Sequence, residues 1–305
     1  MTDPDFQWYS ENMWKLRDWI QEKKLDFHSL CLNPHPGIIP ILQRNWNKIF
    51  PSQLSANPYT INILPTFFKN INWYAFATNP SAISILKKNQ DKIDYRYLSE
   101  NTNILAISML EQNLDKVDWL RISTNPNAME IIKKHTHKIS WSNVCINRNP
   151  EAISFLEENM NKINWTTIST NPFASRLLIQ NQDKINWMFL SLNTNPEIIR
   201  LLEENQDKIN WSYLSKNVEA IFLLKRNMDK ICWINFCSNT NPEIIHILEE
   251  NQHRIVWYKL SENPIIFELN YDFFVQRMNV IRQELMEKTW NIQRYQHWCL
   301  SIDEI

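Results

Sequence analysis

A marker residue, tryptophan in eight of its eleven occurrences, returns along the chain every 22 or 24 residues, and this spacing constrains the fold more than any other feature. The marker positions are Phe27, Pro51, Trp73, Tyr95, Trp119, Trp141, Trp165, Trp187, Trp211, Trp233 and Trp257. Such regularity is typical of one tandem array of similar units. Eleven units are therefore predicted to occupy residues 26–270.

Each unit has an asparagine that precedes proline in nine of the eleven units, as in Asn149-Pro150. Proline holds φ near −65° and lacks the N–H that the first turn of a helix leaves unpaired. It also favours the extended conformation that a helix-capping asparagine needs. The apolar residues that follow, with the spacing of one buried helical stripe, are Ala152, Ile153, Leu156 and Met160. Asn159 is expected to end this helix in a left-handed cap.

The second half of a unit begins at the marker. The residue before the marker is usually Asn, Asp or Ser, which again favours a helix start. Trp165, Ile168 and Ser169 then share one face of a helix of about six residues. Helices this short are marginal alone in water, so stacking of neighbouring units must supply the core. The sequence predicts an all-α fold, a curved α-solenoid of about eleven short helix-pair repeats.

The consensus Asn-Pro-x-Ala-Ile-x-x-Leu-x-x-Asn-x-Asp-Lys-Ile-x-Trp-x-x-Leu-Ser-x-Asn is clear in residues 79–95, 171–187 and 195–211. It resembles a repeat family encoded by large DNA viruses of amoebae and algae, and the units at Phe27 and Pro51 depart from it. The resemblance implies helical repeats in a viral protein that works inside the host cell. It supplies no catalytic residues.

The segments outside the array differ from it, as capping segments must. Residues 1–25 are predicted to form an N-terminal helical cap, and residues 271–305 a C-terminal capping helix. The residues behind these predictions are Trp8, Trp14, Leu16, Trp19 and Ile20 at one end, and Phe274, Met278, Ile281, Leu285 and Met286 at the other. These ends either cap the core or form a homodimer interface.

Composition excludes several classes of protein. A chain with one glycine, Gly37, and 38 asparagines cannot build many phosphate-binding glycine loops, and asparagine must replace glycine at left-handed turn positions. A net charge of −1 gives no global footprint for nucleic acid. Neither a signal peptide nor an 18-residue apolar run is evident, and the five cysteines show no zinc-type pairing. We expect an intracellular protein that is neither secreted nor membrane-spanning and has no cofactor.

Three residue sets invite a chemical interpretation, and each has a simpler one. The marker tryptophans suit base stacking, but they share a helix face with apolar residues at a fixed repeat position, which favours core packing. Cys31, Cys145 and Cys237 occupy a position that is serine in other units, which favours a small buried residue over a nucleophile. His135 and His137 replace repeat residues at a helix end, which favours substitution within the repeat over half a metal site.

A basic residue recurs in the Asp-Lys-Ile segment, as at Lys92, Lys116, Lys184, Lys208 and Arg254. A stripe of this kind can track phosphates. A cation that follows a helix C-terminus also interacts favourably with the negative end of the helix dipole and with the exposed carbonyls. This structural interpretation is the stronger one.

Charge at the end of the first helix alternates between units. The 24-residue units carry Glu-Glu at 157–158, 203–204 and 249–250, and the 22-residue units carry basic pairs at 87–88, 133–134 and 225–226, with Ile179-Gln180 as the exception. Either neighbouring units pair these charges, or two units complete one turn and the solenoid has two charged flanks. We favour one unit per turn, because a helix pair is already a complete stacking layer.

The positions just after the marker vary most and are expected to face outward. The aromatic and basic residues at these positions are Tyr74, Arg96, Tyr97, Arg121, Phe189, Tyr213, Tyr258 and Lys259. Aromatic residues and arginine are typical of protein-binding hot spots, although a merely variable solvated face would look similar. Because no catalytic constellation converges, the sequence predicts a non-catalytic scaffold that binds a host or viral protein. A nucleic-acid-binding solenoid that uses the lysine stripe is the alternative.

Overall fold

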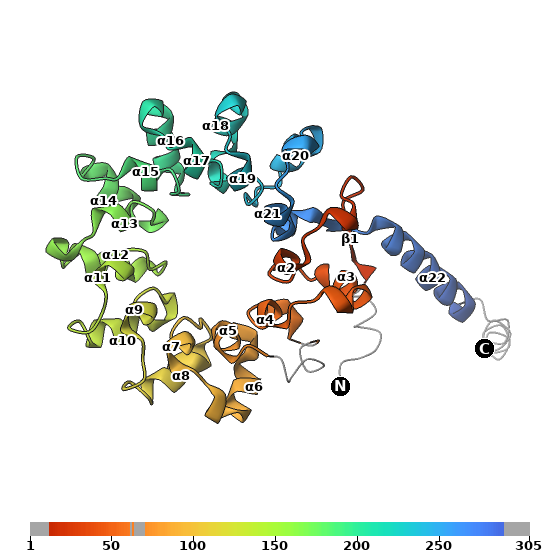
Figure 1. Cartoon of the computed structure of the whole chain (residues 1–305), viewed down its shortest axis with the longest axis horizontal. Coiled ribbons are helices and arrows are strands. Elements are labelled where there is room, and N and C mark those ends of the chain that lie inside the picture. Colours follow the sequence, from red (N-terminus) through yellow and green to blue (C-terminus); the bar gives the residue numbers. More distant parts are fainter. Residues whose placement is uncertain (1–11, 62, 64–70, 290–305) are drawn as a thin grey trace, which may run out of the picture.

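The helices of the chain follow one another around a ring, as the computed structural model shows (Figure 1). The structure describes residues 12–61, 63 and 71–289. Helices dominate this part of the chain, with one small two-stranded sheet, so the predicted all-α class is confirmed.

One short helix begins at each of the eleven marker positions. These helices are α2 (Phe27–Leu30), α4 (Pro51–Leu54), α5 (Trp73–Thr78), α7 (Tyr95–Leu98), α9 (Trp119–Ile122), α11 (Trp141–Val144), α13 (Trp165–Ile168), α15 (Trp187–Leu190), α17 (Trp211–Leu214), α19 (Trp233–Phe236) and α21 (Trp257–Ser261). Most are shorter than the six residues predicted. Figure 1 shows α15, α17 and α19 toward the centre of the ring.

The helix that begins after the capping asparagine lies toward the outside, as α16, α18 and α20 do in Figure 1. These outer helices are α3 (Ile38–Arg44), α6 (Ile83–Lys88), α8 (Ile104–Glu111), α10 (Met129–Lys134), α12 (Pro150–Glu157), α14 (Ser175–Gln180), α16 (Pro196–Glu204), α18 (Ile221–Arg226) and α20 (Ile244–Glu250). The corresponding part of the Pro51 unit falls largely outside the described residues.

Single 3₁₀ turns occur along the described chain, and most of them lead into or out of an outer helix. They are η1 (Glu22–Lys24), η2 (Trp46–Lys48), η3 (Pro58–Thr60), η5 (Pro80–Ala82), η6 (Gln90–Lys92), η7 (Pro126–Ala128), η8 (Met160–Lys162), η9 (Pro172–Ala174), η10 (Gln206–Lys208), η11 (Val218–Ala220), η12 (Met228–Lys230), η13 (Gln252–Arg254) and η14 (Pro264–Ile266). Ala152, Ile153 and Leu156 are buried as predicted. Met160 is 41% exposed because it begins such a turn instead of continuing α12.

The asparagines before proline cap helices as the sequence predicts. The side chain of Asn149 accepts a hydrogen bond from the backbone N–H of Glu151 at the start of α12. Asn171 accepts in the same way from Phe173 at the start of η9. Each cap satisfies a donor that the first turn would otherwise leave unpaired.

The asparagines at the ends of the outer helices do not act as predicted. No described residue has positive φ, and Asn159 has φ −129° and ψ 47°, so the expected left-handed caps are absent from the described chain. The amide of Asn159 instead donates to the carbonyl of Phe155, four residues earlier, at 2.8 Å. Seven others do the same: Asn45, Asn89, Asn113, Asn181, Asn205, Asn227 and Asn251. A side-chain donor thus satisfies a terminal carbonyl without a left-handed residue.

A second set of asparagines joins each unit to the one before it. In every unit one buried asparagine amide donates two hydrogen bonds, of 2.6–3.2 Å, to two backbone carbonyls of the preceding unit. We call this set the asparagine ladder; its members are Asn33, Asn57, Asn79, Asn101, Asn125, Asn147, Asn171, Asn193, Asn217, Asn239 and Asn263. Consecutive units therefore stack directly on each other, which confirms the favoured prediction that one unit forms one stacking layer.

The ladder also explains the alternation between 22 and 24 residues. In a 22-residue unit Asn171 serves both functions, because its amide joins the ladder while its oxygen caps η9. In a 24-residue unit the functions are divided: Asn147 joins the ladder, and Asn149, two residues later, caps α12. The two additional residues are the second asparagine and its spacer.

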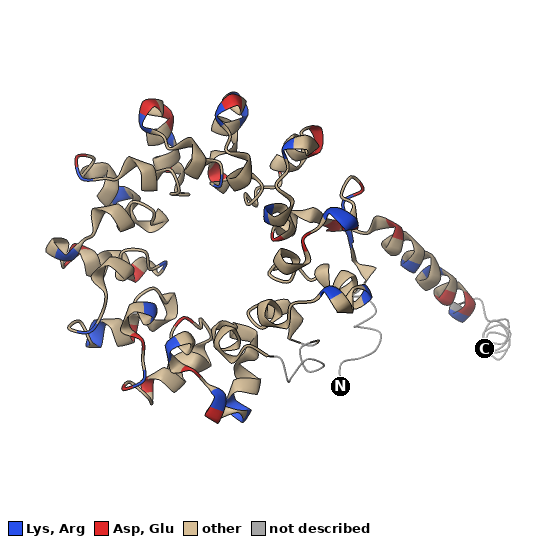
Figure 2. Ribbon diagram, in the orientation of Figure 1, with Lys and Arg blue, Asp and Glu red and all other residues tan. Residues whose placement is uncertain are grey.

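Charged residues occur on the outer helices, as the red and blue parts of the ribbon in Figure 2 show for α16, α18 and α20. Several form ion pairs between neighbouring units: Lys133 with Glu151 at 2.7 Å, Lys225 with Glu243 at 2.6 Å and Arg226 with Glu203 at 3.0 Å. Neighbouring units thus pair these charges: Glu151 and Glu243 lie at the start of the following outer helix, and Glu203 lies at the end of the preceding one. Because the side chains are exposed, we expect little stability from these pairs.

The first and last units pack against each other and close the ring. The amide of Asn33 donates to the carbonyls of Ser261 and Asn263 at 2.8 and 2.9 Å, as every other ladder asparagine does to its neighbour. The N–H of Asp26 also donates to the Ser261 hydroxyl. The marker helix at Phe27 therefore packs against the marker helix at Trp257, so the array has no free end among its eleven units.

A small sheet reinforces this contact between the first and last units, which we call the seam. Strand β1 (Trp14–Leu16) pairs antiparallel with β2 (Phe267–Leu269), and Lys15 lies opposite Glu268. Arg17 donates from its backbone N–H to Ile266 and from its side chain to Ile265 and Glu268. The predicted N-terminal helix is therefore wrong for residues 13–21, because residues 14–16 of this segment pair with β2 instead. Trp8 lies outside the described residues.

Aromatic contacts fill the space beside the sheet. The ring of His35 stacks on Phe267 at 4.7 Å and meets the edge of Trp14 at 4.6 Å. The single glycine lies here too: a Cβ at Gly37 would come within 2.6 Å of the Phe267 ring. Its φ of −60° is ordinary, so close packing against the C-terminal strand is what favours glycine at this position.

Acidification is expected to weaken the seam through His35. Burial lowers the pKa of His35 below its ordinary value of 6.5, and its Nδ1 accepts a hydrogen bond from the Gly37 N–H. The neutral ring is therefore favoured in the folded protein, and its stabilising contribution is lost as pH falls below 6.5 through the lowered pKa. Urea unfolding at pH 7.5 and 5.5 should show a loss that is smaller in His35→Asn. An equal loss in both proteins would contradict this.

The last helix, α22 (Tyr271–Thr289), projects away from the ring (Figure 1). It is helical as predicted through Phe274, Met278, Ile281, Leu285 and Met286, and the rest of the predicted 271–305 segment lies outside the described residues. Most of its side chains are exposed, so α22 does not cover the end of a core. The seam takes the place of the expected caps.

Candidate functional site

The marker rings lie at the boundary between core and solvent. All eight marker tryptophans are partly buried and pack against the apolar core, as their phase predicts. A cation from the following unit covers most marker rings at 4.3–5.2 Å: Lys48 over Phe27, Lys92 over Trp73, Lys116 over Tyr95, Lys138 over Trp119, Lys184 over Trp165, Lys208 over Trp187, Lys230 over Trp211 and Arg254 over Trp233. Lys24 covers Trp257 across the seam.

These contacts give the lysine stripe a structural role that differs from the one the sequence favoured. Each cation lies over the face of a neighbouring aromatic ring, an attractive arrangement known as a cation–π interaction. The aliphatic part of the lysine also shields the ring from water. The stripe therefore adds another contact between consecutive units, beside the asparagine ladder and the bonds in which the N–H before a marker donates to a serine hydroxyl of the neighbouring unit.

The two positions that follow each marker form the candidate site, which we call the short-helix face. The first position after the marker is the more exposed one, as at Tyr74 (55%) and Tyr258 (44%). The second position is half-buried at Tyr97, Arg121 and Phe189, where it contacts a neighbouring unit. The face consequently has an outer row of exposed residues and an inner row that links units.

Three predicted residues from consecutive units meet on this face. The rings of Tyr74 and Tyr97 lie 5.4 Å apart, and the Arg121 guanidinium lies 4.5 Å from the centre of the Tyr97 ring. Their order along the ring is the order of the units, so they form a continuous aromatic and cationic strip on α5, α7 and α9.

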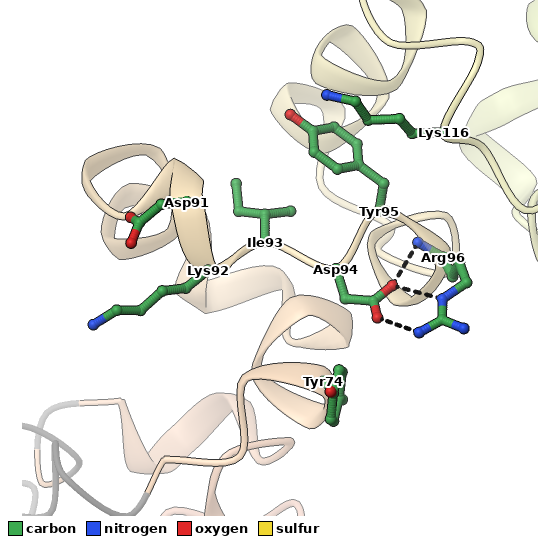
Figure 3. A pocket seen from close by; sticks show the side chains of 8 residues that line it. All are labelled: Tyr74, Asp91, Lys92, Ile93, Asp94, Tyr95, Arg96 and Lys116. Atoms are coloured by element: carbon green, nitrogen blue, oxygen red, sulfur yellow. Dashed lines mark hydrogen bonds and ion pairs between the residues drawn. The ribbon is translucent and has the colours of Figure 1, made fainter.

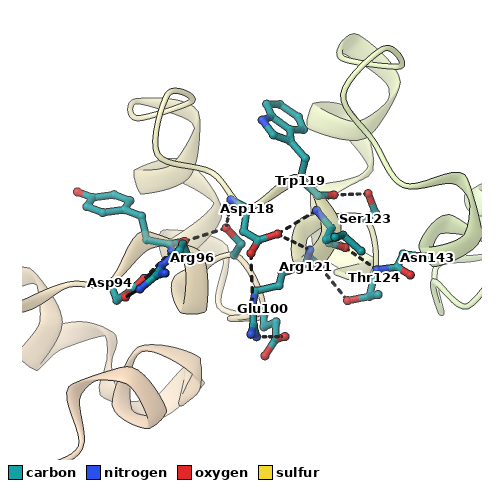
Figure 4. Close-up of polar contacts among 12 residues, drawn as sticks. Asp94, Arg96, Glu100, Asp118, Trp119, Arg121, Ser123, Thr124 and Asn143 are labelled. Atoms are coloured by element: carbon teal, nitrogen blue, oxygen red, sulfur yellow. Dashed lines mark hydrogen bonds and ion pairs between the residues drawn. The ribbon is translucent and has the colours of Figure 1, made fainter.

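Arg121 is fixed by two carboxylates, which Figure 4 shows around it. It pairs with Glu100 of the preceding unit and, at 3.4 Å, with Asp118 of its own. Asp118 also caps α9 through the N–H groups of Leu120 and Arg121. The guanidinium is thus held against Tyr97 before any partner arrives, which reduces the ordering cost of a contact there.

Arg96 lies beside the strip and faces a shallow hollow of about 350 Å³ (Figure 3). Its side chain donates two hydrogen bonds to Asp94, of 3.1 and 2.7 Å. These bonds hold the pKa of the Asp94 carboxyl below its usual range. Tyr74 and Lys116 also line the hollow, whose surface therefore mixes aromatic, acidic and basic groups.

The other four predicted residues form two separate pairs. The rings of Phe189 and Tyr213, from consecutive units, lie 5.9 Å apart. Tyr258 and Lys259 belong to α21 at the seam, where the Lys259 ammonium lies 5.2 Å from the Tyr258 ring. The eight residues thus share one register of the repeat but form three groups around the ring.

Sequence reasoning missed the aliphatic members of the outer row. Leu120 is 61% exposed, and Met188 and Ile234 are each 41% exposed, at the position that Tyr74 and Tyr258 occupy. The register was visible in the sequence, but only aromatic and basic side chains were selected from it. Large apolar residues at a solvent-facing repeat position were the available signal.

The three cysteines at the serine position of the repeat, Cys31, Cys145 and Cys237, are buried, as predicted. The sulfur atoms of Cys145 and Cys237 accept the N–H that precedes the next marker at 3.4 Å, and serine hydroxyls accept the same bond in other units. Burial raises the pKa of the Cys31, Cys145 and Cys237 thiols. These thiols are thus poorly suited to nucleophilic chemistry.

Alkylation should follow this burial. In native protein at pH 8, we expect iodoacetamide to modify Cys31, Cys145 and Cys237 about tenfold more slowly than the half-buried Cys232, because reaction must await local opening. Peptide mass spectrometry over a time course gives the rates, and urea-unfolded protein provides the control. Equal rates at Cys145 and Cys232 in native protein would contradict the expectation.

The remaining candidate chemistry gains no support. His135 ends α10 with the backbone conformation of the asparagine it replaces, and its ring packs on Trp119, 6.4 Å from that of His137. No group of three or more metal-binding side chains occurs within the described ranges. Among the helices that the structure describes, none is long and apolar enough to cross a membrane.

Comparison of the chain with protein-family models, with curated proteins and with solved structures gives no match. The fold and the candidate site therefore define the class of protein on their own: a closed ring of helical repeats with a variable face on its short helices.

Proposed function

We propose that this protein is a non-catalytic scaffold that binds a partner protein through the short-helix face. The observation that carries the proposal is the outer row, where large apolar side chains from several units are exposed at one repeat position. Apolar surface that gathers in this way on a soluble protein is typical of an interaction site. The ladder asparagines, the repeat serines and the cations over the marker rings already make contacts between units.

The preorganised strip of Tyr74, Tyr97 and Arg121 is the proposed centre of the interface, since aromatic residues and arginine dominate binding hot spots. A protein partner is favoured over nucleic acid because the repeated cations lie over marker rings. The resemblance to viral repeats leads us to propose a viral origin and an intracellular partner from the virus or its host.

A matched pair of variants tests the proposal. Tyr74→Ser with Leu120→Ser and Met188→Ser removes part of the outer row, whereas Ile104→Ser with Phe173→Ser removes exposed apolar residues elsewhere. Proteins retained from a lysate of the producing cells would be quantified for each, and the candidates purified for calorimetry. We expect binding to be lost only with the first variant.

Equal retention by both variants would contradict the proposed face. Titration with single- and double-stranded DNA and RNA tests the alternative function, which is binding of nucleic acid. Submicromolar binding that weakens steeply with salt would favour a nucleic-acid-binding ring instead.

A further inference from the structure

A groove of about 430 Å³ runs across four consecutive units, apart from the strip of Tyr74, Tyr97 and Arg121. The loops that follow α11, α13, α15 and α17 line it, on the left and upper arc of the ring in Figure 1. The side chains that matter for its chemistry, in the order of the units, are Ile146, Arg148, Thr170, Leu192, Thr194 and Lys216. We call this the four-unit groove.

Its two ends are cationic. Arg148 belongs to the first of the four loops and Lys216 to the last, and both side chains are exposed. Neither has an ion-pair partner within the part of the chain that the structure describes. The loop position of Lys216 carries Glu100 and Glu262 elsewhere in the ring, and both of these glutamates are paired with cations.

The floor between the ends is apolar with hydroxyl groups. Ile146 and Leu192 supply partly exposed apolar surface, and Thr170 and Thr194 supply hydroxyls. The ladder asparagine Asn171 also lines the groove, but its amide is already bonded to two carbonyls. The framework beneath the groove is therefore rigid before a ligand binds, which lowers the ordering cost of binding.

We infer that the four-unit groove binds an extended acidic segment of a partner protein, an inference that rests on the proposed function and names its partner's chemistry. Arg148 and Lys216 would pair with carboxylates near the two ends of the segment, and alternate side chains between them would contact Ile146 and Leu192. The loops of Arg148 and Lys216 are three units apart. Because packed helices lie roughly 8–10 Å apart, this distance matches about eight residues of extended chain.

A peptide fits the groove better than a single-stranded nucleic acid. Base stacking needs aromatic side chains, and none lines this groove. A strand of the same length would also carry a phosphate at every nucleotide, whereas the groove offers two widely separated cations.

Selection from a random twelve-residue phage-displayed library on the full-length chain tests the inference. We expect enriched sequences to carry acidic residues at two sites separated by about seven positions. Fluorescein-labelled versions of the selected peptides would be titrated by anisotropy against wild type, Arg148→Glu with Lys216→Glu, and a control, Lys87→Glu with Lys88→Glu, which reverses two exposed cations on α6. The groove variant should weaken binding about tenfold or more, and the control should not.

Three results would overturn the inference: no enrichment over an unrelated protein, enriched peptides without acidic residues, or equal affinity for wild type and the groove variant. A fifteen-nucleotide single strand that binds wild type, and loses affinity in the groove variant, would assign the groove to nucleic acid. Circular dichroism of each variant confirms that the fold is retained. The proposed function is tested separately by the Tyr74, Leu120 and Met188 variant, so the groove can fail while the short-helix face stands.

Discussion

Replacing Asn171 with alanine should lower the free energy of unfolding by about 3–4 kcal/mol, a large effect for the loss of one small polar side chain. Asn171 is 2% exposed, and its amide donates to the carbonyls of Cys145 and Asn147 while its oxygen accepts from the Phe173 N–H. The substitution removes the cap, worth about 0.5–2 kcal/mol, and leaves two buried carbonyls without this donor. Chemical unfolding followed by circular dichroism gives the free energy of unfolding.

Two further variants locate the cause. Asn161→Ala changes an exposed asparagine ten residues earlier and should alter stability by less than about 0.5 kcal/mol. Asn171→Asp keeps an oxygen that can cap η9 but replaces the amide donor, so we expect it to remain clearly less stable than wild type at neutral pH. An Asn171→Asp protein as stable as wild type would show that the cap matters and the ladder does not.

The prediction of the repeat from sequence succeeded where the controlling interactions are local. Asn149-Pro150 specifies a helix start through its own backbone and side chain, and the apolar spacing after it specifies the buried face. The pattern was misleading at Asn159, because asparagine offers a side-chain donor as well as tolerance of positive φ. Sequence alone does not distinguish these two ways of ending a helix.

Contacts between units were less accessible to sequence analysis. Lys92 and Trp73 stand nineteen positions apart, and only the stacking geometry brings them within 4.8 Å. The same applies to the strip, where the repeat register placed Tyr97 and Arg121 on one face but did not reveal that Glu100 and Asp118 fix the guanidinium. Register predicts which residues share a surface, whereas contacts depend on the rotation between units.

Closure of the ring depends on that rotation most of all. A small turn at each step accumulates over eleven units, and neither the caps nor the apolar pattern encodes its size. Strand β1 carries no strong signal because its partner is about 250 residues away, and short apolar runs are ambiguous between helix and strand. A closed array also lacks the free ends at which an open solenoid would require caps.

A disulfide across the seam should therefore form within one chain and stabilise the protein strongly. Lys15 and Glu268 are direct partners in the antiparallel sheet, where Cα atoms of opposite residues lie about 4.5–5.5 Å apart, which suits a disulfide. Lys15→Cys with Glu268→Cys would close a loop of about 250 residues, for which loop-closure entropy gives about 5 kcal/mol before any strain in the bond is subtracted. Cys232→Ser and Cys299→Ser in the background limit competing reactions.

The same protein in its reduced form is the matched control, because it differs only by the bond. Non-reducing electrophoresis should show a monomer of altered mobility, and urea unfolding of the oxidised form should need a higher denaturant concentration than that of the reduced form. If the array were open in solution, its two ends would lie far apart, and oxidation would yield either free thiols or linked pairs of chains. A monomer crosslinked without gain in stability would instead mean that strain at the bond offsets the entropy, while the closed ring itself would stand.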